Sequence, residues 1–327
     1  MLQLHLEDLA EMVVAHGARR VGVQLPFGLR RRAREIAKTF GDRDIEVVFS
    51  GTPSYGACDV ADAQMARADV DLLVHFGHSA MLPDSSIPVL YWEVVDDVDI
   101  IKTIRQHRDE LRSRGRSVGL VTTVQHVHQL PSVRDYLVSE GFDARIGDAS
   151  IRVSHPGQVL GCSFETATSL DVDFYLYVGT GYFHPVGISL ATDRPVMYCD
   201  PYTEQCIDVT PVRDRIVRKR YAVIEKARAA THFAVVVSTR RGQYRIDEAL
   251  NIKKLLREHG KTCHIIVAEA VDAALVQDFG FDAYVVAACP RIAIDDAPSF
   301  EKPVLTVTEV PLLFDDRPYQ FDEIHKL

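Results

Sequence analysis

Residues 20–29 read Arg20-Val-Gly-Val-Gln-Leu-Pro-Phe-Gly-Leu29, and a basic segment with a helical pattern follows over residues 29–40. The apolar run predicts a short strand, and the Pro-x-Gly sequence predicts the turn that ends it. Continuous apolar strands that alternate with amphipathic helices are typical of parallel sheets covered by helices on both faces. This stretch therefore indicates an α/β fold.

The same plan recurs in two later segments. Predicted strands begin near residues 20, 45, 72 and 89, then near 117, 142, 174 and 195, and finally near 232, 264, 283 and 304. We expect three similar domains, residues 1–105, 106–210 and 211–327, each a mostly parallel sheet flanked by helices. We expect them to be arranged with pseudo-threefold symmetry around a central site. A helix rich in Arg and Lys over residues 210–231 is predicted to connect the second unit to the third.

Composition narrows the class of protein. Of 327 residues, 47% are hydrophobic and 25% are charged, as in ordinary globular proteins. A net charge of −9 argues against a general nucleic-acid binder, which usually carries a basic surface. No apolar run is as long as a membrane span, and the first residues lack the apolar core of a signal peptide. We therefore expect a cytoplasmic protein with no direct membrane or nucleic-acid partner.

Three of the six cysteines, one in each unit, follow small residues in loops: Cys58, Cys162 and Cys289. Cys58 and Cys162 follow the second strand of their units, whereas Cys289 follows the third strand, so the repeat is imperfect. Open α/β sheets bind ligands at the carboxyl ends of their strands, and all three thiols can reach one such rim. Three thiolates do not complete a structural zinc site but suit a cubane iron–sulfur cluster with one open iron. The alternative is that they are small buried hydrophobic residues.

The other cysteines carry less information. Cys199 ends a predicted strand, Cys206 is expected in a turn or at a helix start, and Cys263 begins a strand. No second Cys or His pair completes a metal site around Cys199 and Cys206. In a reducing compartment they are expected to be free thiols with a structural role.

Histidines at strand ends are further candidates. His75 is expected to point into the sheet, whereas His78 lies where the third strand opens into a loop and can reach a ligand. His184 is the matching residue of the second unit. The alternative for these residues is a turn with satisfied imidazoles. His126 and His128 are expected on a solvated surface.

The glycines over residues 179–187 match neither a dinucleotide fingerprint nor a P-loop, because no Gly-Lys-Ser/Thr follows and no helix is expected there. They are expected to let the backbone approach a ligand. Arg291 could hold a carboxylate through a bidentate pair, and Asp295 and Asp296 could cap the next turn. Arg240, Arg241 and Gln243 are expected to be exposed at a strand end.

Taken in order, these segments resemble the archaeal diphthamide-biosynthesis radical enzymes. The residues that carry the resemblance are Tyr55-Gly-Ala-Cys58-Asp and Leu73-Val-His-Phe-Gly-His78-Ser79, then Gly161-Cys162-Ser and Val178-Gly-Thr-Gly-Tyr-Phe183-His184-Pro-Val-Gly187, then Cys289-Pro-Arg291-Ile-Ala-Ile-Asp295-Asp296, Phe300, Pro303 and Glu309. The resemblance covers nearly the whole chain. One departure is Phe27, which stands between Pro26 and Gly28 where the family usually has an acidic residue.

The resemblance implies a 2-(3-amino-3-carboxypropyl)histidine synthase of the archaeal homodimeric type, which catalyses the first step of diphthamide biosynthesis. Cys58, Cys162 and Cys289 would bind a 4Fe-4S cluster that generates a radical from S-adenosylmethionine, the donor substrate. The 3-amino-3-carboxypropyl group would be transferred to a histidine of translation elongation factor 2, and a reductant protein would supply the electron. The resemblance also implies a pocket for S-adenosylmethionine formed by strand-end residues: Gly56, His78, Ser79, Gly179, Phe183, His184 and Arg291.

Two other functions stay open at this point. An iron–sulfur lyase of the quinolinate synthase type also joins three similar domains and three cysteines around an open iron, but it needs no S-adenosylmethionine. A non-catalytic α/β binding protein with incidental thiols would bind no iron.

Overall fold

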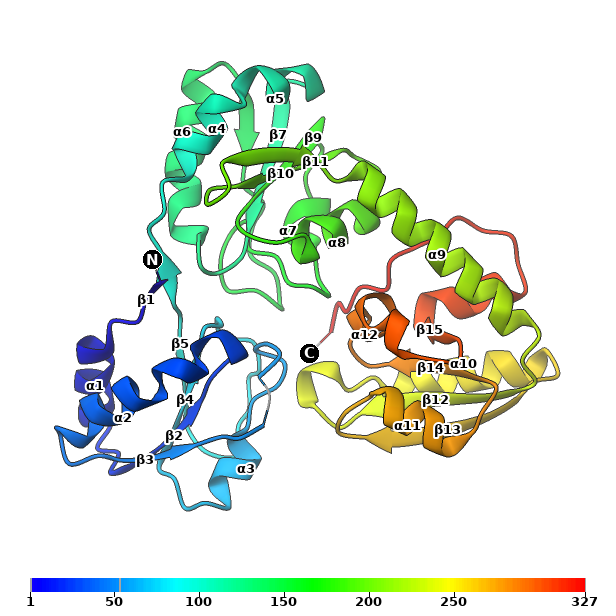
Figure 1. The fold of residues 1–327 in the computed structure, drawn as a ribbon, viewed down its shortest axis with the longest axis horizontal. Coiled ribbons are helices and arrows are strands. Elements are labelled where there is room, and N and C mark those ends of the chain that lie inside the picture. Colours follow the sequence, from blue (N-terminus) through cyan, green and yellow to red (C-terminus); the bar gives the residue numbers. More distant parts are fainter. Residues whose placement is uncertain (1, 53, 327) are drawn as a thin grey trace.

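The computed structural model describes residues 2–52 and 54–326, which form three lobes around a common centre (Figure 1). Each lobe is built on one sheet, in the orders β3-β2-β4-β5, β11-β10-β9-β7-β8 and β13-β12-β14-β15. The strands within each sheet are parallel except β11. If β11 is set aside and the strands of each main sheet are numbered in chain order, every one of these sheets has the strand order 2-1-3-4. The predicted α/β class is confirmed, and threefold symmetry itself stays a prediction.

The first lobe contains one sheet, its flanking helices and a small antiparallel pair between β1 and β6. An N-terminal helix packs against its core, and the sequence pattern did not predict it. The elements are β1 (Leu2–Gln3), α1 (Leu6–Ala15), β2 (Arg20–Gln24), the 3-10 helix η1 (Phe27–Arg32), α2 (Ala33–Gly41), β3 (Glu46–Phe49), α3 (Asp62–Ala66), β4 (Leu72–Phe76), β5 (Val89–Trp92) and β6 (Val95–Asp96).

The second lobe corrects two expectations. A helix does follow the glycines at 179–181 directly, and Cys206 lies on a strand, not in a turn or at a helix start. The elements are α4 (Ile100–Gln106), α5 (Arg108–Arg114), β7 (Ser117–Thr122), η2 (Val127–Gln129), α6 (Leu130–Ser139), β8 (Asp143–Arg145), α7 (Glu165–Thr168), β9 (Phe174–Val178), α8 (Phe183–Ala191), β10 (Val196–Asp200) and β11 (Gln205–Asp208).

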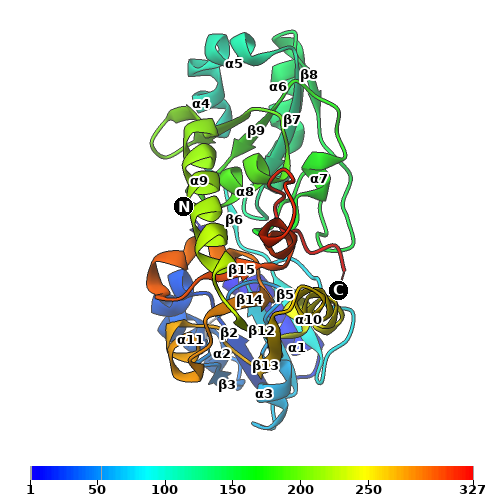
Figure 2. The same ribbon diagram turned by 90° about the vertical axis from the view of Figure 1, so that its right-hand side faces the viewer.

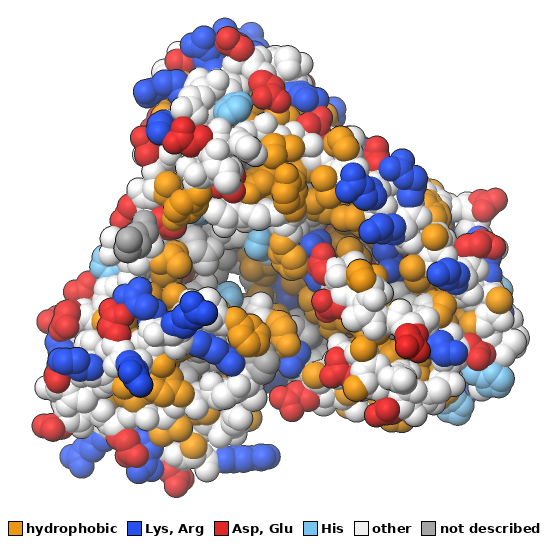
Figure 3. Space-filling view, in the orientation of Figure 1, with side chains coloured by type: hydrophobic (Ala, Val, Ile, Leu, Met, Phe, Trp, Pro, Cys, Tyr) orange, Lys and Arg blue, Asp and Glu red, His pale blue; other side chains and the backbone are white. Residues whose placement is uncertain are grey.

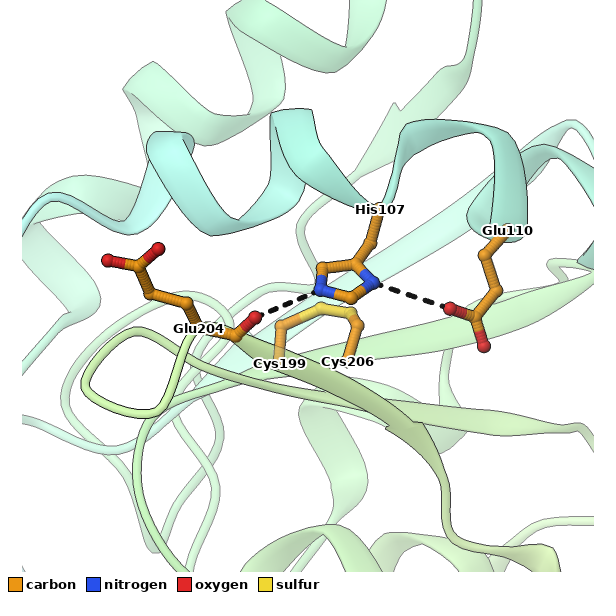
Figure 4. Close-up of a disulfide and its surroundings, with 5 residues drawn as sticks. All are labelled: His107, Glu110, Cys199, Glu204 and Cys206. Atoms are coloured by element: carbon orange, nitrogen blue, oxygen red, sulfur yellow. Dashed lines mark hydrogen bonds and ion pairs between the residues drawn. A yellow bond between two sulfur atoms is a disulfide. The ribbon is translucent and has the colours of Figure 1, made fainter.

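A disulfide joins the two antiparallel strands at the edge of this sheet. Cys199 and Cys206 are directly opposite each other on β10 and β11, with their Cα atoms 4.1 Å apart. The His107 ring lies over the bridge, 2.9 Å from the Glu204 carbonyl oxygen and 3.4 Å from the Glu110 carboxylate (Figure 4). The expectation that both thiols are free is therefore wrong, because strand pairing that the sequence pattern did not reveal places them side by side.

The third lobe begins with the predicted connecting helix α9, which runs from the second lobe to the third (Figure 2). Its elements are α9 (Thr210–Arg228), β12 (His232–Ser238), η3 (Arg241–Gln243), α10 (Ile246–Glu258), β13 (Thr262–Ala268), α11 (Ala273–Phe279), β14 (Ala283–Ala287), α12 (Arg291–Asp295), η4 (Ala297–Ser299), β15 (Val304–Thr306) and η5 (Val307–Leu313). Within the described residues, no helix has both the length and the apolar character that a membrane span needs.

Each sheet has its own apolar core, which is consistent with three domains. The side chains of Ile100 and Ile104 on α4 are fully buried in the core of the second sheet. We therefore propose that the first boundary lies before α4, a few residues earlier than the division at 105/106, and that the second lies near residue 210.

A buried ion pair fixes the connecting helix to the third sheet. The Arg220 guanidinium on α9 donates to both carboxylate oxygens of Glu309 at 2.7 and 2.8 Å, and its remaining donors reach the carbonyl oxygens of Ala293 and Val304. Arg220 is 2% exposed and Glu309 0% exposed. A charge buried this deeply requires its partner, because water cannot replace it.

We predict that Glu309→Ala will destabilise the protein by about 3–5 kcal/mol, the usual cost of leaving one member of a buried pair uncompensated. Urea unfolding of the full chain measures the loss. The exposed pair of Arg20 and Glu46 offers a matched control, and Glu46→Gln should leave the unfolding midpoint unchanged. Equal midpoints for the Glu309→Ala variant and the wild type would contradict the assignment.

Candidate functional site

The three predicted ligand cysteines line one cavity of about 220 Å³ at the centre of the molecule. Cys58 lies in the loop after β3, Cys162 in the loop between β8 and α7, and Cys289 directly after β14. All three loops leave the carboxyl ends of parallel strands, and the surface is hollowed where the lobes meet (Figure 3). A larger depression of about 680 Å³ lies at the amino ends of the second sheet and is lined by no Cys or His.

Cys162 is buried, Cys58 and Cys289 are partly buried, and the three thiols are close enough to influence one another. Burial raises the pKa of Cys58 to about 11, and the neighbouring Cys162 contributes to the rise. Burial raises the pKa of Cys162, and burial together with the other two thiols raises that of Cys289. Across the described ranges, no three Cys, His, Asp or Glu side chains are arranged to hold one metal ion.

A buried cation faces these thiols. Arg152 is 1% exposed, and its Nη2 donates to the Gly242 carbonyl oxygen at 3.0 Å and lies 3.8 Å from Cys162 Sγ and 3.6 Å from Met81 Sδ. Its Nε has no hydrogen-bond partner, and no carboxylate of residues 2–52 or 54–326 forms an ion pair with it. A buried guanidinium needs a negative charge nearby. A cluster held by three thiolates would supply that charge, so the residues fit the group.

The third lobe supports the Cys58 loop directly. The Gly242 N–H donates to the Cys58 carbonyl oxygen at 3.2 Å, and Gln243 Nε2 donates to Cys58 Sγ at 3.3 Å. A Cβ on Gly242 would lie 2.5 Å from Cys58 Cα. The expected exposure of Gln243 is wrong, because its side chain is 4% exposed beneath the thiol. Arg240 is also largely covered and pairs with Asp59, whereas Arg241 is exposed and reaches Asp62.

Most of the residues predicted for the S-adenosylmethionine pocket lie in the cavity wall: Gly56, His78, Ser79, Phe183, His184 and Arg291. Gly179 does not line the cavity. Its φ of +147° places the backbone close to the Tyr177 ring, and a Cβ at this position would lie 2.9 Å from the Tyr177 hydroxyl oxygen. Only glycine tolerates this combination of backbone angle and close approach.

The Arg291 guanidinium stacks on the Phe183 ring, 3.9 Å from the ring centroid. Its Nε lies 2.6 Å from the Asp295 carboxylate, so Asp295 pairs with Arg291 and does not cap the next turn. Asp296 lies at the N-cap of η4 without a side-chain cap bond. Arg291 Nη1 is buried and has no partner among the described residues. This free donor lies in a residue that lines the cavity, which is the arrangement expected for binding an anionic group.

The candidate histidines at strand ends, His75 and His184, are held by neighbouring side chains, and His126 and His128 lie in another loop. His75 is fully buried between Gln24 and His78, as expected, whereas the His184 ring stacks on Tyr177. His126 is 4% exposed, which contradicts the expected surface position, and burial lowers its pKa. It is covered because its loop packs against β6 of the first lobe, where the Asp96 N–H donates to the Gln125 carbonyl oxygen, a tertiary contact that the local sequence does not show. His128 remains partly exposed beside Asp97.

The departure at Phe27 lies outside the cavity. The Phe27 ring is 61% exposed and is covered on one face by the Arg30 guanidinium at 4.5 Å. Pro26 and Gly28 line a neighbouring cavity of about 390 Å³, whereas Phe27 does not. The aromatic residue therefore occupies the family's acidic position without entering either cavity.

The family model described as "Putative diphthamide synthesis protein" matches residues 25–325 of this chain. The chain belongs to the diphthamide synthesis family. It is 41% identical to 2-(3-amino-3-carboxypropyl)histidine synthase of Pyrococcus horikoshii, over 94% of this chain and 90% of that protein. It is 31% identical to subunit 1 of the Schizosaccharomyces pombe synthase, over 93% of this chain and 71% of that protein.

Solved structures of the same family match this fold. The crystal structure of Dph2 from Pyrococcus horikoshii superposes with a TM-score of 0.95 at 39% identity, over 99% of this chain and 95% of that one. A second crystal structure of that protein contains a 4Fe-4S cluster and gives a TM-score of 0.94, over 99% of this chain and 94% of that one.

Two residues of the site were missed in the sequence. Gln24 is fully buried and contacts both His75 and the Cys58 loop. A glutamine inside an apolar strand was the available signal, because a polar side chain there must find partners. Arg152 lies in an irregular loop, and no local pattern marks it as buried.

We predict that Cys58 of the iron-free protein will react slowly with iodoacetamide. At pH 8 a pKa of about 11 leaves about 100-fold less thiolate than an ordinary cysteine has, and the thiolate is the reactive form. The rate should rise about tenfold per pH unit until the pH approaches 11. Mass spectrometry of the Cys58 peptide measures it, with urea-unfolded protein as the control. Equal rates in the folded and unfolded protein would contradict the prediction.

Proposed function

We propose that this chain is a 2-(3-amino-3-carboxypropyl)histidine synthase, the enzyme of the first step of diphthamide biosynthesis. It transfers the 3-amino-3-carboxypropyl group of S-adenosylmethionine to a histidine of translation elongation factor 2. One observation carries the proposal: thiols from three lobes line one cavity and face a buried guanidinium that has no carboxylate partner among the described residues.

In this proposal Cys58, Cys162 and Cys289 hold a 4Fe-4S cluster. When bound, the cluster supplies an open iron and the electron that breaks a carbon–sulfur bond. The chain's own residues would balance the negative charge of the cluster ligands and hold them in place. Arg152 offsets the negative charge of the thiolates, and Gln243 donates a hydrogen bond to Cys58 Sγ.

The remaining wall of the cavity forms the proposed pocket for S-adenosylmethionine. The unpartnered Nη1 of Arg291 is suited to the carboxylate of the methionyl part, and Phe183 holds the guanidinium in place by stacking. Gly56, Ser79 and His184 supply the rest of the wall. Gly179 supports the pocket without lining it, because it lets the turn after β9 pass close to Tyr177.

The partners follow from the reaction. A protein substrate, elongation factor 2, presents the acceptor histidine, and a reductant protein supplies the electron. We propose a homodimer in the cytoplasm, where the elongation factor works. No step needs membrane or nucleic-acid contact.

Anaerobic turnover tests the proposal. After reconstitution with iron and sulfide and reduction with dithionite, the wild type should convert S-adenosylmethionine to methylthioadenosine and modify elongation factor 2. Replacing Cys58, Cys162 or Cys289 by alanine should abolish bound iron and turnover, because each cysteine is one of only three ligands. Cys263→Ala is the matched control, since this buried thiol lies on β13, outside the cavity.

Other products would point elsewhere. Deoxyadenosine would indicate a conventional radical enzyme, and an iron-loaded protein that leaves S-adenosylmethionine intact would favour the lyase. A protein that binds no iron would leave only a binding function.

We predict that Gly242→Ala will fold but bind less iron than the wild type. The added methyl group would overlap the backbone and Cβ of Cys58 and displace this ligand. Iron and sulfide per chain after reconstitution measure the effect. Gly41→Ala is the matched control, because nothing lies within 4 Å of its added Cβ. Full iron content in Gly242→Ala would show that Cys58 does not need its present position.

A further inference from the structure

A chain of hydrogen bonds leads from the Cys58 loop to the central cavity, and backbone groups fix its direction. Gln24 Nε2 donates to the Asp59 carbonyl oxygen at 2.7 Å, and Gln24 Oε1 accepts from the Ala61 N–H at 2.9 Å. A carbonyl can only accept and an N–H can only donate. The orientation of the Gln24 amide is therefore determined by the main chain on both sides of it.

The fixed amide determines the tautomers of two histidines. Gln24 Oε1 lies 2.8 Å from His75 Nδ1, so Nδ1 carries the hydrogen and His75 Nε2 is left as an acceptor. His75 Nε2 lies 2.9 Å from His78 Nδ1, so that nitrogen in turn carries the hydrogen. His78 Nε2 is thereby left with a free lone pair. If the hydrogen of His78 were on Nε2 instead, its Nδ1 and the Nε2 of His75 would be two acceptors facing each other, and no hydrogen bond could form between them.

The position of His78 places this lone pair where it can meet a substrate. His78 lines both the central cavity and the neighbouring cavity of about 390 Å³, which also contains Asp96 and His126. Burial lowers the pKa of His78 to about 4 and that of His75 to about 3, so both rings are neutral at pH 7. A neutral imidazole has a lone pair that can accept a proton, and the low pKa means that the ring passes the proton on easily.

The proposed reaction releases one proton. A carbon–sulfur bond of the sulfonium breaks, a carbon–carbon bond forms at C2 of the acceptor imidazole, and the C2–H bond breaks. The sum is methylthioadenosine, substituted histidine and H⁺, with no net oxidation. The electron that the cluster would give for carbon–sulfur cleavage would return to the cluster when the radical adduct loses its proton. A group in the cavity must therefore accept that proton.

We propose that Nε2 of His78 accepts the C2 proton of the acceptor imidazole, with His75 and Gln24 as the positioning residues that hold its tautomer. This inference rests on the proposed function. His184 also lines the cavity, but it is less suited because the nearby Arg291 guanidinium opposes a second positive charge there. A proton on His78 can leave toward the second cavity, which the same ring lines.

The tautomer is measured first, on the wild-type protein without iron. Nitrogen-15 correlation spectra of the ring, assigned by the loss of signals in His78→Asn, should show hydrogen on Nδ1 and none on Nε2. In His75→Leu the acceptor is gone and the Nε2–H form should appear, whereas His75→Gln should restore the wild-type form. Hydrogen on Nε2 in the wild type would overturn the proposal.

The catalytic test separates cleavage from transfer. His78→Asn keeps a donor for His75 but lacks a base at Nε2. Because His78 also lines the proposed pocket for S-adenosylmethionine, we expect methylthioadenosine formation to fall as well, but modification of elongation factor 2 should fall about 100-fold further, the usual range for a lost general base. Deuterium at C2 of the acceptor histidine should slow transfer more in the variant than in the wild type. His259→Asn, an exposed residue on the third lobe, should change neither rate.

Each failure has a different meaning. Wild-type transfer in His78→Asn, or an equal loss of cleavage and transfer, would overturn the role of His78 while leaving the proposed function intact. A wild-type protein that forms no methylthioadenosine would overturn both. If His78→Asn does not fold, His75→Leu provides the same comparison, and its transfer should fall more than its cleavage.

Discussion

The Arg152 guanidinium is the interaction on which the centre of the molecule depends. It contacts Met81 of the first lobe, Cys162 of its own lobe and the Gly242 carbonyl of the third. A cation this deeply buried is costly unless negative charge lies beside it. The three lobes therefore meet around the positive charge of Arg152, which neutral hydrogen-bond acceptors such as the Gly242 carbonyl oxygen stabilise only in part. The neighbouring thiols, once deprotonated, can supply the negative charge that balances it.

The direction of the parallel strands explains why these groups meet at all. In each sheet the loops that carry the cysteines leave the carboxyl edge, and the three edges face one another. The repeat need not be perfect for this to work, since Cys289 follows a different strand from Cys58 and Cys162. What matters is that every loop ends at the same rim. Close backbone contacts, such as Gly242 on Cys58, then fix the ligands more tightly than side-chain packing alone.

The sequence predicts local features well and contacts between lobes poorly. Apolar runs located the parallel strands, and small residues before Cys58, Cys162 and Cys289 located the loops. The pattern did not reveal β11, because its pairing with β10 depends on a hairpin, and so the bridge between Cys199 and Cys206 was unexpected. His126 and Gln243 look like exposed polar residues until another lobe covers them. The order of motifs along the chain identified the family because it does not depend on such contacts.

The last described residues return to the second lobe and bind the backbone of the loop that carries Cys162. The Ile324 N–H donates to the Cys162 carbonyl oxygen at 2.8 Å, and Glu323 accepts from the Phe164 N–H. Asp322, two residues earlier, pairs with Arg245 of the third lobe. This segment thus holds the loop of one thiol against the third lobe.

The contact between Ile324 and Cys162 also sets an order of events during synthesis, because Ile324 is made 162 residues after Cys162. At ribosomal speeds this takes about 8–32 s. During that interval the second lobe can fold while the third lobe is being translated, but the loop of Cys162 still lacks its backbone partner Ile324. The backbone support of the Cys162 loop is therefore completed only when translation has passed Ile324.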